Sequence, residues 1–346
     1  MIKPRCLKKW DKVATVSLSW GWPWAVPERY LIGKKQIEEK FGVELVEMTN
    51  TMQDPTRVYD HPEERAKDLM DAFRDPTIKG IFSTIWGDDS IRILPYIDFD
   101  VIRNNPKVFM GYSDTTITHF ICFKAGIVSF YGPSIMAGFG ENGWLFPYMV
   151  DSVHKAIFSS EVIWEVSANK DGWTNEFLPW NNPENQKKKR NLFPASSWRW
   201  LQWEGKVIGK LLWGCVDVFP FIIGTSIWPS VDEWKNKILF LEPSEEKISD
   251  THFERIVRNL GSQGVLHVIK GIIVGRAQMD YQTNTQLNYD KQLIKIVSME
   301  FGLKDLPIVT NMDFWHTDPM FVIPVGIEAQ LDCDNKIFLI MENPCV

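Results

Sequence analysis

The sequence has 346 residues, which is too long for one small module and long enough for two domains with sizeable cores. Hydrophobic residues make up 45% of the chain and charged residues 24%, which excludes a disordered or fibrous protein. The net charge of −6 argues against binding to a nucleic acid polymer, because phosphate contacts need a basic surface.

The first part of the chain alternates strand and helix patterns. Apolar, β-rich runs predict strands at residues 12–19, 43–48, 80–85 and 107–112. Helices are predicted at residues 27–41, 61–73, 91–97 and 114–124, the second with an amphipathic pattern. Gly42 and Gly126 follow two of them, Gly42 as a C-terminal stop. This alternation implies right-handed βαβ units and a parallel sheet, which binds ligands at the carboxyl ends of its strands.

Residues 167–200 interrupt this alternation. The segment is rich in Asn, Pro and Lys and predicts a long loop; such loops in compact proteins are usually lids, binding loops or tethers. Its basic run, residues 187–190, predicts a solvated surface, with a phosphate contact as the alternative. Nine of the 16 tryptophans fall between residues 164 and 234, and tryptophan supplies flat area either to a core or to a ring-stacking pocket.

The second half is richer in strands. Strand patterns occur at residues 206–212, 237–241, 271–274, 307–310, 326–332 and 336–340, and helix patterns at 249–260 and 288–301. We therefore predict an α/β fold in three parts. An N-terminal α/β domain spans residues 1–166, a tryptophan-rich linker spans 167–204, and a β-rich domain spans 205–346.

The chain carries no apolar run of eighteen residues, so we expect no membrane span. Its first residues lack the apolar core and cleavage site of a signal peptide, so we expect a cytoplasmic protein. The cysteines Cys6, Cys122, Cys215, Cys333 and Cys345 are scattered and odd in number. We expect them to be reduced thiols, forming neither a disulfide framework nor a zinc site.

The strongest local motif is KVFMGYSDTT at residues 107–116. An apolar strand runs into Gly111, then to Ser113, then into a helix, which is the context of a nucleophile elbow. There the serine hydroxyl stands at a helix N-terminus whose N–H groups can stabilise an oxyanion. The fit to G-x-S-x-G is partial, because Thr115 occupies the second glycine position. The alternative is that Ser113 or Asp114 is only an N-cap.

A serine nucleophile needs a base and an orienting carboxylate. His316 lies directly after the strand at 307–310, and Glu242 ends the apolar run ILFLE at 238–242. His119, six residues after Ser113, does not face the same point. The chain order Ser113, Glu242, His316 is one that known triads use, and it places substrate in a cleft between the two domains. The alternative for Glu242 is a solvated loop residue.

Other chemistries find little support. There is no phosphate-binding glycine loop, dinucleotide fingerprint, HExxH or EF-hand loop, and the pair Asp88-Asp89 fits helix-start acids better than a metal site. We expect no metal and no cofactor.

With these residues identified, the chain resembles the serine peptidase family that contains the bacterial L,D-carboxypeptidases and the microcin C immunity proteins. The resemblance runs in order over nearly the whole chain. It rests on the segments at residues 13–21, 87–98, 107–116, 131–133, 209–225, 238–242 and 307–327.

The resemblance implies Ser113 as nucleophile, His316 as general base and then acid, and Glu242 as its orienting partner. It implies an oxyanion hole formed by the backbone N–H of Asp114 and of a residue near Gly87. It further implies a flavodoxin-like N-terminal domain, a β-rich C-terminal domain and a homodimer without a metal.

Two departures stand out. The family often has paired glycines where this chain has Trp86-Gly87 and Trp213-Gly214. Since glycine permits close backbone approach or a positive φ, we expect Trp86 to bear on the oxyanion geometry and Trp213 to narrow the cleft.

The tryptophan-rich stretch at residues 198–205 resembles the microcin immunity branch more than the cell-wall branch. An adenine ring stacks on tryptophan, so we expect Trp180 and Trp198 to bind substrate, with core packing as the alternative for each. The expected function is a serine hydrolase cleaving the amide of peptidyl- or aminoacyl-nucleotides. The alternatives are an L,D-carboxypeptidase that releases D-alanine from muropeptides, and a catalytically silent ligand-binding protein.

Overall fold

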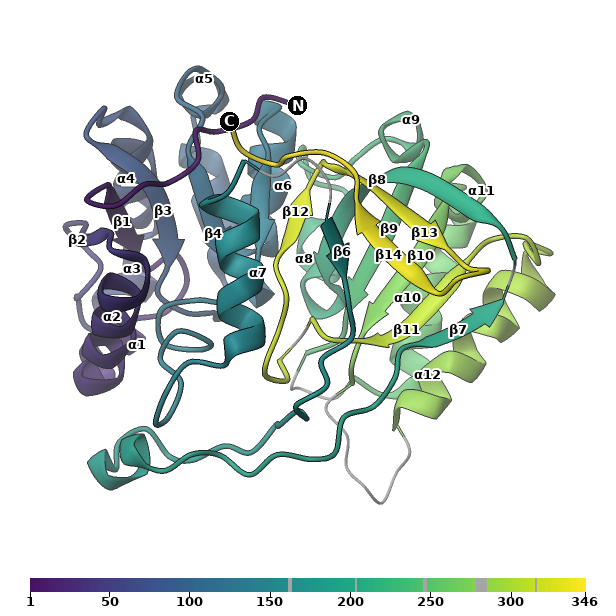
Figure 1. Cartoon of the computed structure of the whole chain (residues 1–346). Coiled ribbons are helices and arrows are strands. Elements are labelled where there is room, and N and C mark those ends of the chain that lie inside the picture. Colours follow the sequence, from purple (N-terminus) through teal and green to yellow (C-terminus); the bar gives the residue numbers. More distant parts are fainter. Residues whose placement is uncertain (161–163, 203, 245–247, 278–284, 315) are drawn as a thin grey trace.

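The computed structural model describes residues 1–160, 164–202, 204–244, 248–277, 285–314 and 316–346. Trp203 of the tryptophan-rich stretch and Trp315 beside the predicted base lie outside the described residues. Two sheets lie next to each other, one built mainly from the first part of the chain and one from the second (Figure 1). This arrangement confirms the predicted α/β class with a second, β-rich part.

The N-terminal sheet has the strand order β12-β5-β4-β3-β1-β2. Its first five strands in the chain are parallel and give the order 2-1-3-4-5, which is that of flavodoxin-like folds. β12 comes from the C-terminal part and pairs antiparallel with β5. The strands are β1 (Lys12–Val16), β2 (Glu44–Glu47), β3 (Ile78–Ser83), β4 (Val108–Gly111), β5 (Ser129–Tyr131) and β12 (Ile323–Val325).

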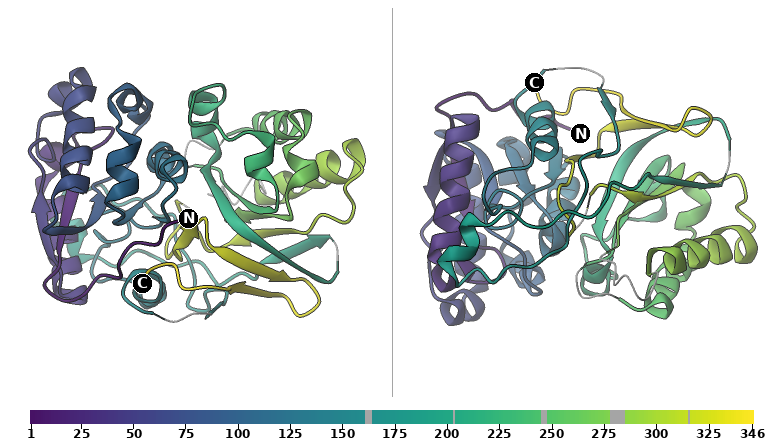
Figure 2. Two further views of the ribbon diagram at one scale, coloured as in Figure 1. Left: turned by 90° about the horizontal axis from the view of Figure 1, so that it is seen from above. Right: turned by 60° about the horizontal axis from the view of Figure 1, so that its bottom comes forward.

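Helices connect these strands and cover the sheet (Figure 2). The four predicted helices are confirmed, the one at 91–97 as a 3₁₀ helix, and Gly42 and Gly126 end two of them with φ values of +71° and +82°. The helical elements of this part are α1 (Trp22–Ala25), α2 (Pro27–Phe41), α3 (Pro55–Asp60), α4 (Pro62–Arg74), η1 (Ser90–Tyr96), α5 (Phe99–Asn104), η2 (Ser113–Thr115), α6 (Thr116–Ala125) and α7 (Pro147–Ile157).

The C-terminal sheet has the order β6-β14-β13-β8-β9-β10-β11-β7. Its four central strands, β8 to β11, are parallel. β7 pairs antiparallel with β11 at one side, and β13, β14 and β6 continue the sheet antiparallel from β8 at the other. All six predicted strands of this half are confirmed. The strands are β6 (Trp164–Val166), β7 (Arg199–Gln202), β8 (Lys206–Cys215), β9 (Lys237–Glu242), β10 (Gly271–Gly275), β11 (Ile308–Met312), β13 (Glu328–Asp332) and β14 (Ile337–Ile340).

Helices of this half pack around that sheet. The two predicted helices are confirmed, the second as an α-helix that continues into a π-helical segment. The helical elements of this half are η4 (Val216–Val218), α8 (Phe219–Ile222), α9 (Val231–Trp234), α10 (Asp250–Ser262), α11 (Val265–Val268), α12 (Thr285–Leu293) and η5 (Ile294–Glu300).

The segment at 167–198 is largely irregular, as predicted, and contains only the short helix η3 (Pro183–Lys187). It runs along one side of the molecule, at the bottom of Figure 1. The strands on either side of it, β6 and β7, both pair within the C-terminal sheet. The segment therefore leaves that sheet and returns to it.

The prediction that all cysteines are reduced is wrong for one pair. Cys6 and Cys345 form a disulfide with a Cα–Cα distance of 5.0 Å, although 339 residues separate them in sequence. The two chain ends lie together, with the Cys6 amide donating to the Val346 carbonyl at 2.8 Å (Figures 1 and 2). Spacing in the sequence gives no sign of such a contact. The other three cysteines, Cys122, Cys215 and Cys333, are buried thiols outside this disulfide.

Among the described residues, no helix combines the length and the apolar character that crossing a bilayer would need.

Candidate active site

The turn after β4 has the geometry of a nucleophile elbow. Ser113 starts η2 with a φ of +60°, which is uncommon for a residue other than glycine and typical of strained functional turns. Thr115, at the second glycine position of the motif, donates its hydroxyl hydrogen to the Tyr112 carbonyl at 2.6 Å and so closes the turn. α6 begins only at Thr116, so neither Ser113 nor Asp114 is its N-cap.

Glu242 and His316 form a buried pair. Glu242 is the last residue of β9, and its side chain has no exposed surface, so the alternative of a solvated loop residue does not hold. His316 Nδ1 donates to Glu242 Oε1 at 2.5 Å, and the imidazole is 2% exposed. A carboxylate on Nδ1 fixes the tautomer and makes Nε2 the nitrogen that can exchange a proton.

Tyr131 connects this pair to the turn. The tyrosine ends β5, next to β4, and its hydroxyl accepts the Ser113 N–H at 2.9 Å while it donates to Glu242 Oε2. The Tyr112 ring also lies against the His316 ring, with centroids 4.9 Å apart. The structure therefore brings Ser113, Glu242 and His316 into one cluster from three strand ends.

The sequence reasoning gave Tyr131 no role. The signal that could have found it is its position at the end of a strand beside the nucleophile strand, because carboxyl ends of parallel strands share one edge of the sheet.

The turn after β3 packs against the nucleophile turn. The Ser90 N–H donates to Asp114 Oδ2 at 2.9 Å, and the Ser90 hydroxyl donates to the Asp114 carbonyl at 3.0 Å. A Cβ at Gly87 would lie 1.9 Å from Ser19 Oγ, so any larger residue here would displace the Ser19 side chain. Gly87 and Ser113 line the same cavity. These contacts hold the two turns that supply the expected oxyanion donors in fixed positions.

Asp89 of the same turn forms an ion pair with the buried Arg65 at 2.7 Å. Its role as the partner of an arginine agrees with the preference for a structural acid over a metal ligand. Within the ranges that the structure describes, no three His, Cys, Asp or Glu side chains gather as a metal site.

His119 is committed elsewhere. Its Nδ1 lies 2.8 Å from Ser129 Oγ, and its Nε2 lies 3.0 Å from the Gly111 carbonyl oxygen. Burial lowers the pKa of His119 to about 4. A neutral imidazole in these contacts supports the strand below the nucleophile turn, in line with the prediction that it does not face the site.

Two cavities meet at Trp86. One, of about 330 Å³, is lined by Ser113 and by residues from both halves of the chain, among them Trp20, Trp22, Asp217 and Phe221. The other, of about 390 Å³, is lined by His316, Tyr112, Arg29 and Trp180. Trp86 lines both, and its ring centroid is 5.5 Å from that of His316. The predicted cleft between the two halves is thus present, with an aromatic wall.

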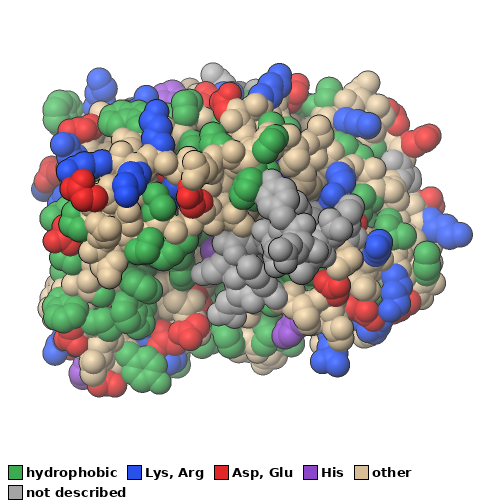
Figure 3. All heavy atoms as spheres, turned by 90° about the horizontal axis from the view of Figure 1, so that it is seen from below, with side chains coloured by type: hydrophobic (Ala, Val, Ile, Leu, Met, Phe, Trp, Pro, Cys, Tyr) green, Lys and Arg blue, Asp and Glu red, His purple; other side chains and the backbone are tan. Residues whose placement is uncertain are grey.

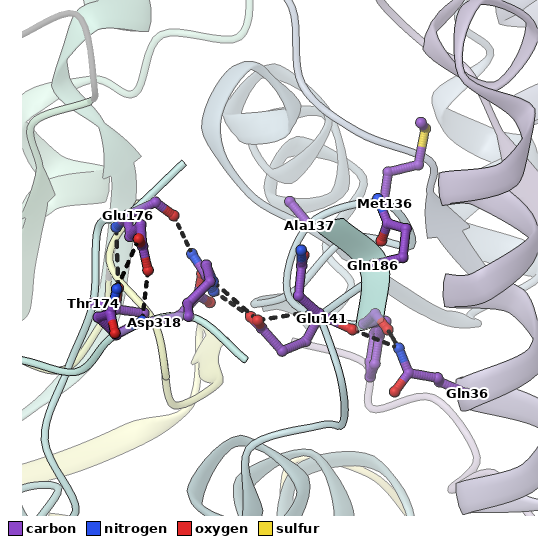
Figure 4. Close-up of polar contacts among 12 residues, drawn as sticks. Gln36, Met136, Ala137, Glu141, Thr174, Glu176, Gln186 and Asp318 are labelled. Atoms are coloured by element: carbon purple, nitrogen blue, oxygen red, sulfur yellow. Dashed lines mark hydrogen bonds and ion pairs between the residues drawn. The ribbon is translucent and has the colours of Figure 1, made fainter. Parts of the chain in front are cut away.

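A buried ionic network anchors the 167–198 segment (Figure 4). Arg190 Nε donates to Glu141 Oε1 at 2.9 Å, and Arg190 Nη2 lies 2.6 Å from Asp318 Oδ2. Although burial opposes it, the carboxylates of Asp318 and Glu141 hold the pKa of Arg190 above its usual value. Glu141 belongs to the N-terminal half, and Asp318 lies two residues after His316. Arg190 therefore links the 167–198 segment to both halves of the chain and to the loop after β11 that carries His316.

The four residues of the basic run at 187–190 differ in their exposure. Lys187, Lys188 and Lys189 are exposed, as expected, whereas the Arg190 side chain is only 12% exposed. Arg190 was not recognised from the sequence, because its two partners are remote in the chain.

Trp180 and Trp198 have different surroundings. Trp180 lines the His316 cavity, lies 6.1 Å from Trp86 by ring centroids, and is covered by the Arg29 guanidinium at 4.8 Å. Trp198 is buried, donates its indole N–H to Asp313 at 2.7 Å, and packs against Phe321 and Phe338. Trp198 is therefore a core residue, and only Trp180 is retained as a candidate for substrate binding.

Trp86 and Trp213, each followed by a glycine in the sequence, also differ in their surroundings. Trp86 lies in the cleft, as described, next to the turn with Gly87. Trp213 has a φ of +126° but is 1% exposed and stacks on Trp234 with centroids 4.5 Å apart. The expectation that Trp213 narrows the cleft is therefore wrong, because its side chain turns into the core.

Comparison with protein families gives two matches. Residues 13–132 match the model described as the LD-carboxypeptidase N-terminal domain, and residues 208–331 match the LD-carboxypeptidase C-terminal domain. A carboxypeptidase homologue of Vibrio cholerae is 30% identical over 98% of this chain and 97% of its own length. The microcin C7 self-immunity protein MccF of Escherichia coli is 30% identical over 81% of this chain and 79% of its own length.

Solved structures of related proteins match the chain as well. An MccF-like protein from Streptococcus pneumoniae in complex with AMP superposes with a TM-score of 0.86 and 27% identity, covering 96% of this chain and 99% of its own. MccF in complex with aspartyl sulfamoyl adenosine gives a TM-score of 0.84 and 26% identity, with both chains covered in full. The match therefore extends over both halves and the cleft between them.

Proposed function

The chain belongs to the LD-carboxypeptidase family of peptidases, and from this premise we propose that it is a serine hydrolase cleaving the amide bond of peptidyl- or aminoacyl-nucleotides. The observation that carries the proposal is the buried cluster of Ser113, Tyr131, Glu242 and His316 at the base of an aromatic cleft. The cluster supplies a nucleophile, a base and a fixed carboxylate, which are the parts that acyl transfer requires.

In the proposed reaction, Glu242 holds His316 so that its Nε2 removes the Ser113 hydroxyl proton. The Ser113 oxygen then attacks the substrate carbonyl carbon, and the N–H groups of Gly87 and Asp114 stabilise the oxyanion. The C–N bond breaks, and His316 returns the proton to the leaving nitrogen. Water, activated by the same histidine, hydrolyses the acyl-enzyme and restores Ser113.

The nucleotide portion is supported by the aromatic lining. Trp22, Trp86 and Trp180 lie side by side on the cleft wall, and stacking of a base on an aromatic ring contributes about 1–3 kcal/mol. Two structural relatives carry AMP and aspartyl sulfamoyl adenosine. We therefore propose Trp180 as a stacking residue for a small nucleotide-like ligand.

The second candidate is an L,D-carboxypeptidase that releases terminal D-alanine from a muropeptide. It shares the mechanism and differs in the leaving group. The observation that favours it is Arg29 on the wall of the His316 cavity, where a guanidinium can meet a substrate carboxylate.

A paired hydrolysis assay read by mass spectrometry tests both. One substrate is a peptidyl-adenylate analogue with a non-labile phosphoramide link, and the other is a muramyl tetrapeptide ending in D-alanine. Cleavage of the adenylate alone, lost in Ser113→Ala, would support the first proposal, and release of D-alanine alone would support the second. Activity retained in folded Ser113→Ala or His316→Ala would overturn the assigned catalytic residues.

The proposal includes a cytoplasmic enzyme that acts as a homodimer. Because the cytosol keeps most thiols reduced, the Cys6–Cys345 bond makes the compartment testable. Alkylation of the protein in its native cells, followed by mass spectrometry, would find both cysteines free in a reducing compartment and bonded in an oxidising one. Sedimentation velocity would measure the oligomeric state.

A further inference from the structure

We propose that Tyr131 is a positioning residue that couples the nucleophile turn to the Glu242–His316 pair. The inference rests on the proposed serine hydrolase function and assigns a role to a residue that the mechanism above does not use. Tyr131 touches neither substrate nor the reacting atoms in that mechanism, so it acts through the groups that it holds.

The direction of its hydrogen bonds follows from the groups involved. An ionised carboxylate can only accept, so the single hydroxyl hydrogen of Tyr131 points to Glu242 Oε2. The hydroxyl oxygen then accepts the Ser113 N–H at 2.9 Å. Tyr131 is 2% exposed and Glu242 is fully buried, so water does not compete at this point. One hydroxyl thus joins the backbone of the nucleophile to the orienting carboxylate.

The first consequence concerns Glu242. Its Oε1 binds His316 and its Oε2 binds Tyr131, so the two contacts together fix the rotation of the carboxylate. A buried carboxylate stays ionised only when hydrogen bonds or charges compensate its lost hydration. Tyr131 therefore stabilises the form of Glu242 that holds His316 in the productive tautomer.

The second consequence concerns the oxyanion hole. In the chymotrypsin template the N–H of the nucleophile itself donates to the oxyanion. In this chain the Ser113 N–H is bound to Tyr131, which leaves that task to other amides, such as those of Asp114 and Gly87. The same bond helps to hold Ser113 at its positive φ, a conformation that persists only when its surroundings enforce it.

Packing keeps the Tyr131 ring in place independently of its hydroxyl. The ring lies 5.3 Å from that of His119 and 5.4 Å, edge to face, from that of Phe240, two residues before Glu242 on β9. Phenylalanine at this position would retain these contacts and lose only the hydroxyl. Tyr131→Phe is therefore a substitution that separates positioning from packing.

The test measures the reactivity of Ser113 without reference to the natural substrate. Wild type and Tyr131→Phe are labelled with a fluorophosphonate between pH 5 and 9, and the rate of Ser113 modification is followed by intact-protein mass spectrometry. We expect Tyr131→Phe to react about 10- to 100-fold more slowly, the range for losing one hydrogen bond to a charged group. We also expect the acid limb of its pH profile to move to higher pH by about half a unit. Without the Tyr131 donor, Glu242 stabilises the protonated form of His316 more strongly, so the histidine becomes a free base only at higher pH.

The matched control is Tyr30→Phe. Tyr30 is equally buried and its hydroxyl also bonds a hydroxyl and a carboxylate, those of Thr15 at 2.9 Å and Glu47 at 3.1 Å, outside the catalytic cluster. It should label within about twofold of wild type with an unchanged profile, since it lacks contact with the site. Rates are normalised to the fraction of folded protein, measured by circular dichroism, so that a loss of stability does not count as a loss of reactivity.

The outcomes separate the two claims. Labelling of Tyr131→Phe at the wild-type rate and with the wild-type pH profile would overturn the positioning role and leave the nucleophile assignment standing. Labelling of wild type at a residue other than Ser113, or labelling that persists in Ser113→Ala, would overturn the proposed function and this inference with it.

Discussion

Two tryptophan clusters in this molecule lie within reach of the same nucleophile turn but have different environments. The buried cluster joins the two halves of the chain: Phe120 of α6 packs against Trp213, which also contacts Phe219, Trp228 and Trp234. Trp213 and Trp234 are at most 1% exposed. Through Phe120 this cluster packs against α6, the helix that follows the nucleophile turn.

The cleft cluster lines the cavities above the turn. It consists of Trp20, Trp22, Trp86 and Trp180. The ring centroids are 4.5 Å apart for Trp20 and Trp22, 5.9 Å for Trp22 and Trp180, and 6.1 Å for Trp180 and Trp86. All four are partly exposed. On the face seen from below in Figure 3, hydrophobic side chains gather over the N-terminal half.

The difference shows what decides the role of a tryptophan. A ring whose faces are already covered by protein contributes to stability, and a ring with a face open to water can contribute to binding, because a ligand can still displace that water. Three of the four cleft tryptophans come from residues 20–86, outside the region of residues 164–234 that holds nine of the 16 tryptophans. The number of tryptophans in that region therefore does not by itself locate the cleft wall.

Removing a ring from the buried cluster should have the largest effect. We expect Trp234→Ala to lower the free energy of unfolding by about 4 kcal/mol, the cost of a large cavity in a packed core. The folded fraction should keep the wild-type KM for the adenylate analogue. Urea denaturation followed by circular dichroism measures the first, and steady-state kinetics measures the second. A loss below about 1 kcal/mol would mean that the cluster is not the packed interface described here.

Breaking the ion pairs of Arg190 should affect both the stability of the protein and its KM for the adenylate analogue. Arg190→Met leaves Glu141 and Asp318 without their shared cation, and we expect a loss of about 3 kcal/mol in stability. The 167–198 segment, which carries Trp180, is then less firmly held. We therefore expect KM for the adenylate analogue to rise about tenfold, which corresponds to losing part of the stacking energy of one base. Thermal unfolding and KM are measured on the same preparations.

The control for this variant comes from the same basic run. Lys187 forms an exposed ion pair with Glu184, and such pairs contribute little to stability. Lys187→Met should therefore resemble wild type in both measurements. Equal effects of the two variants would show that charge, rather than the buried network, is responsible.

The binding role of the cleft cluster is tested by Trp180→Ala. We expect KM for the adenylate analogue to rise about 10- to 100-fold, in line with the loss of one stacked base, while kcat changes little. The free energy of unfolding should change by less than about 1 kcal/mol, because the ring is partly exposed. Trp144→Ala, at an exposed tryptophan that lines neither cleft cavity, is the control. An unchanged KM in Trp180→Ala would remove the argument for a nucleotide.

The sequence was sufficient to predict a parallel α/β arrangement in the first part, the six strands listed for the second part, and the positions of the three candidate residues at or after strand ends. Ser113 follows the apolar run at 107–112, Glu242 ends the run at 238–242, and His316 lies on the loop after the strand at 307–310. Tyr131 was missed because β5 has only three residues, too few to show a period. Arg190 and the Cys6–Cys345 bond were missed for another reason. Their partners are distant in the chain, and only the folded structure brings them together.

The smallest expected effect concerns Trp213, whose backbone sets it apart within the buried cluster. Its φ of +126° is costly for any residue with a Cβ, and glycine avoids that cost. Both Trp213→Ala and Trp213→Gly lose the ring and leave the same cavity. In ordinary strand positions glycine is the less stable of the two, but here we expect Trp213→Gly to be more stable than Trp213→Ala by about 1 kcal/mol. Urea denaturation of the two variants side by side measures this difference. The opposite order would mean that the backbone at residue 213 relaxes once the ring is gone, so that the stacking of Trp213 on Trp234 imposes the positive φ.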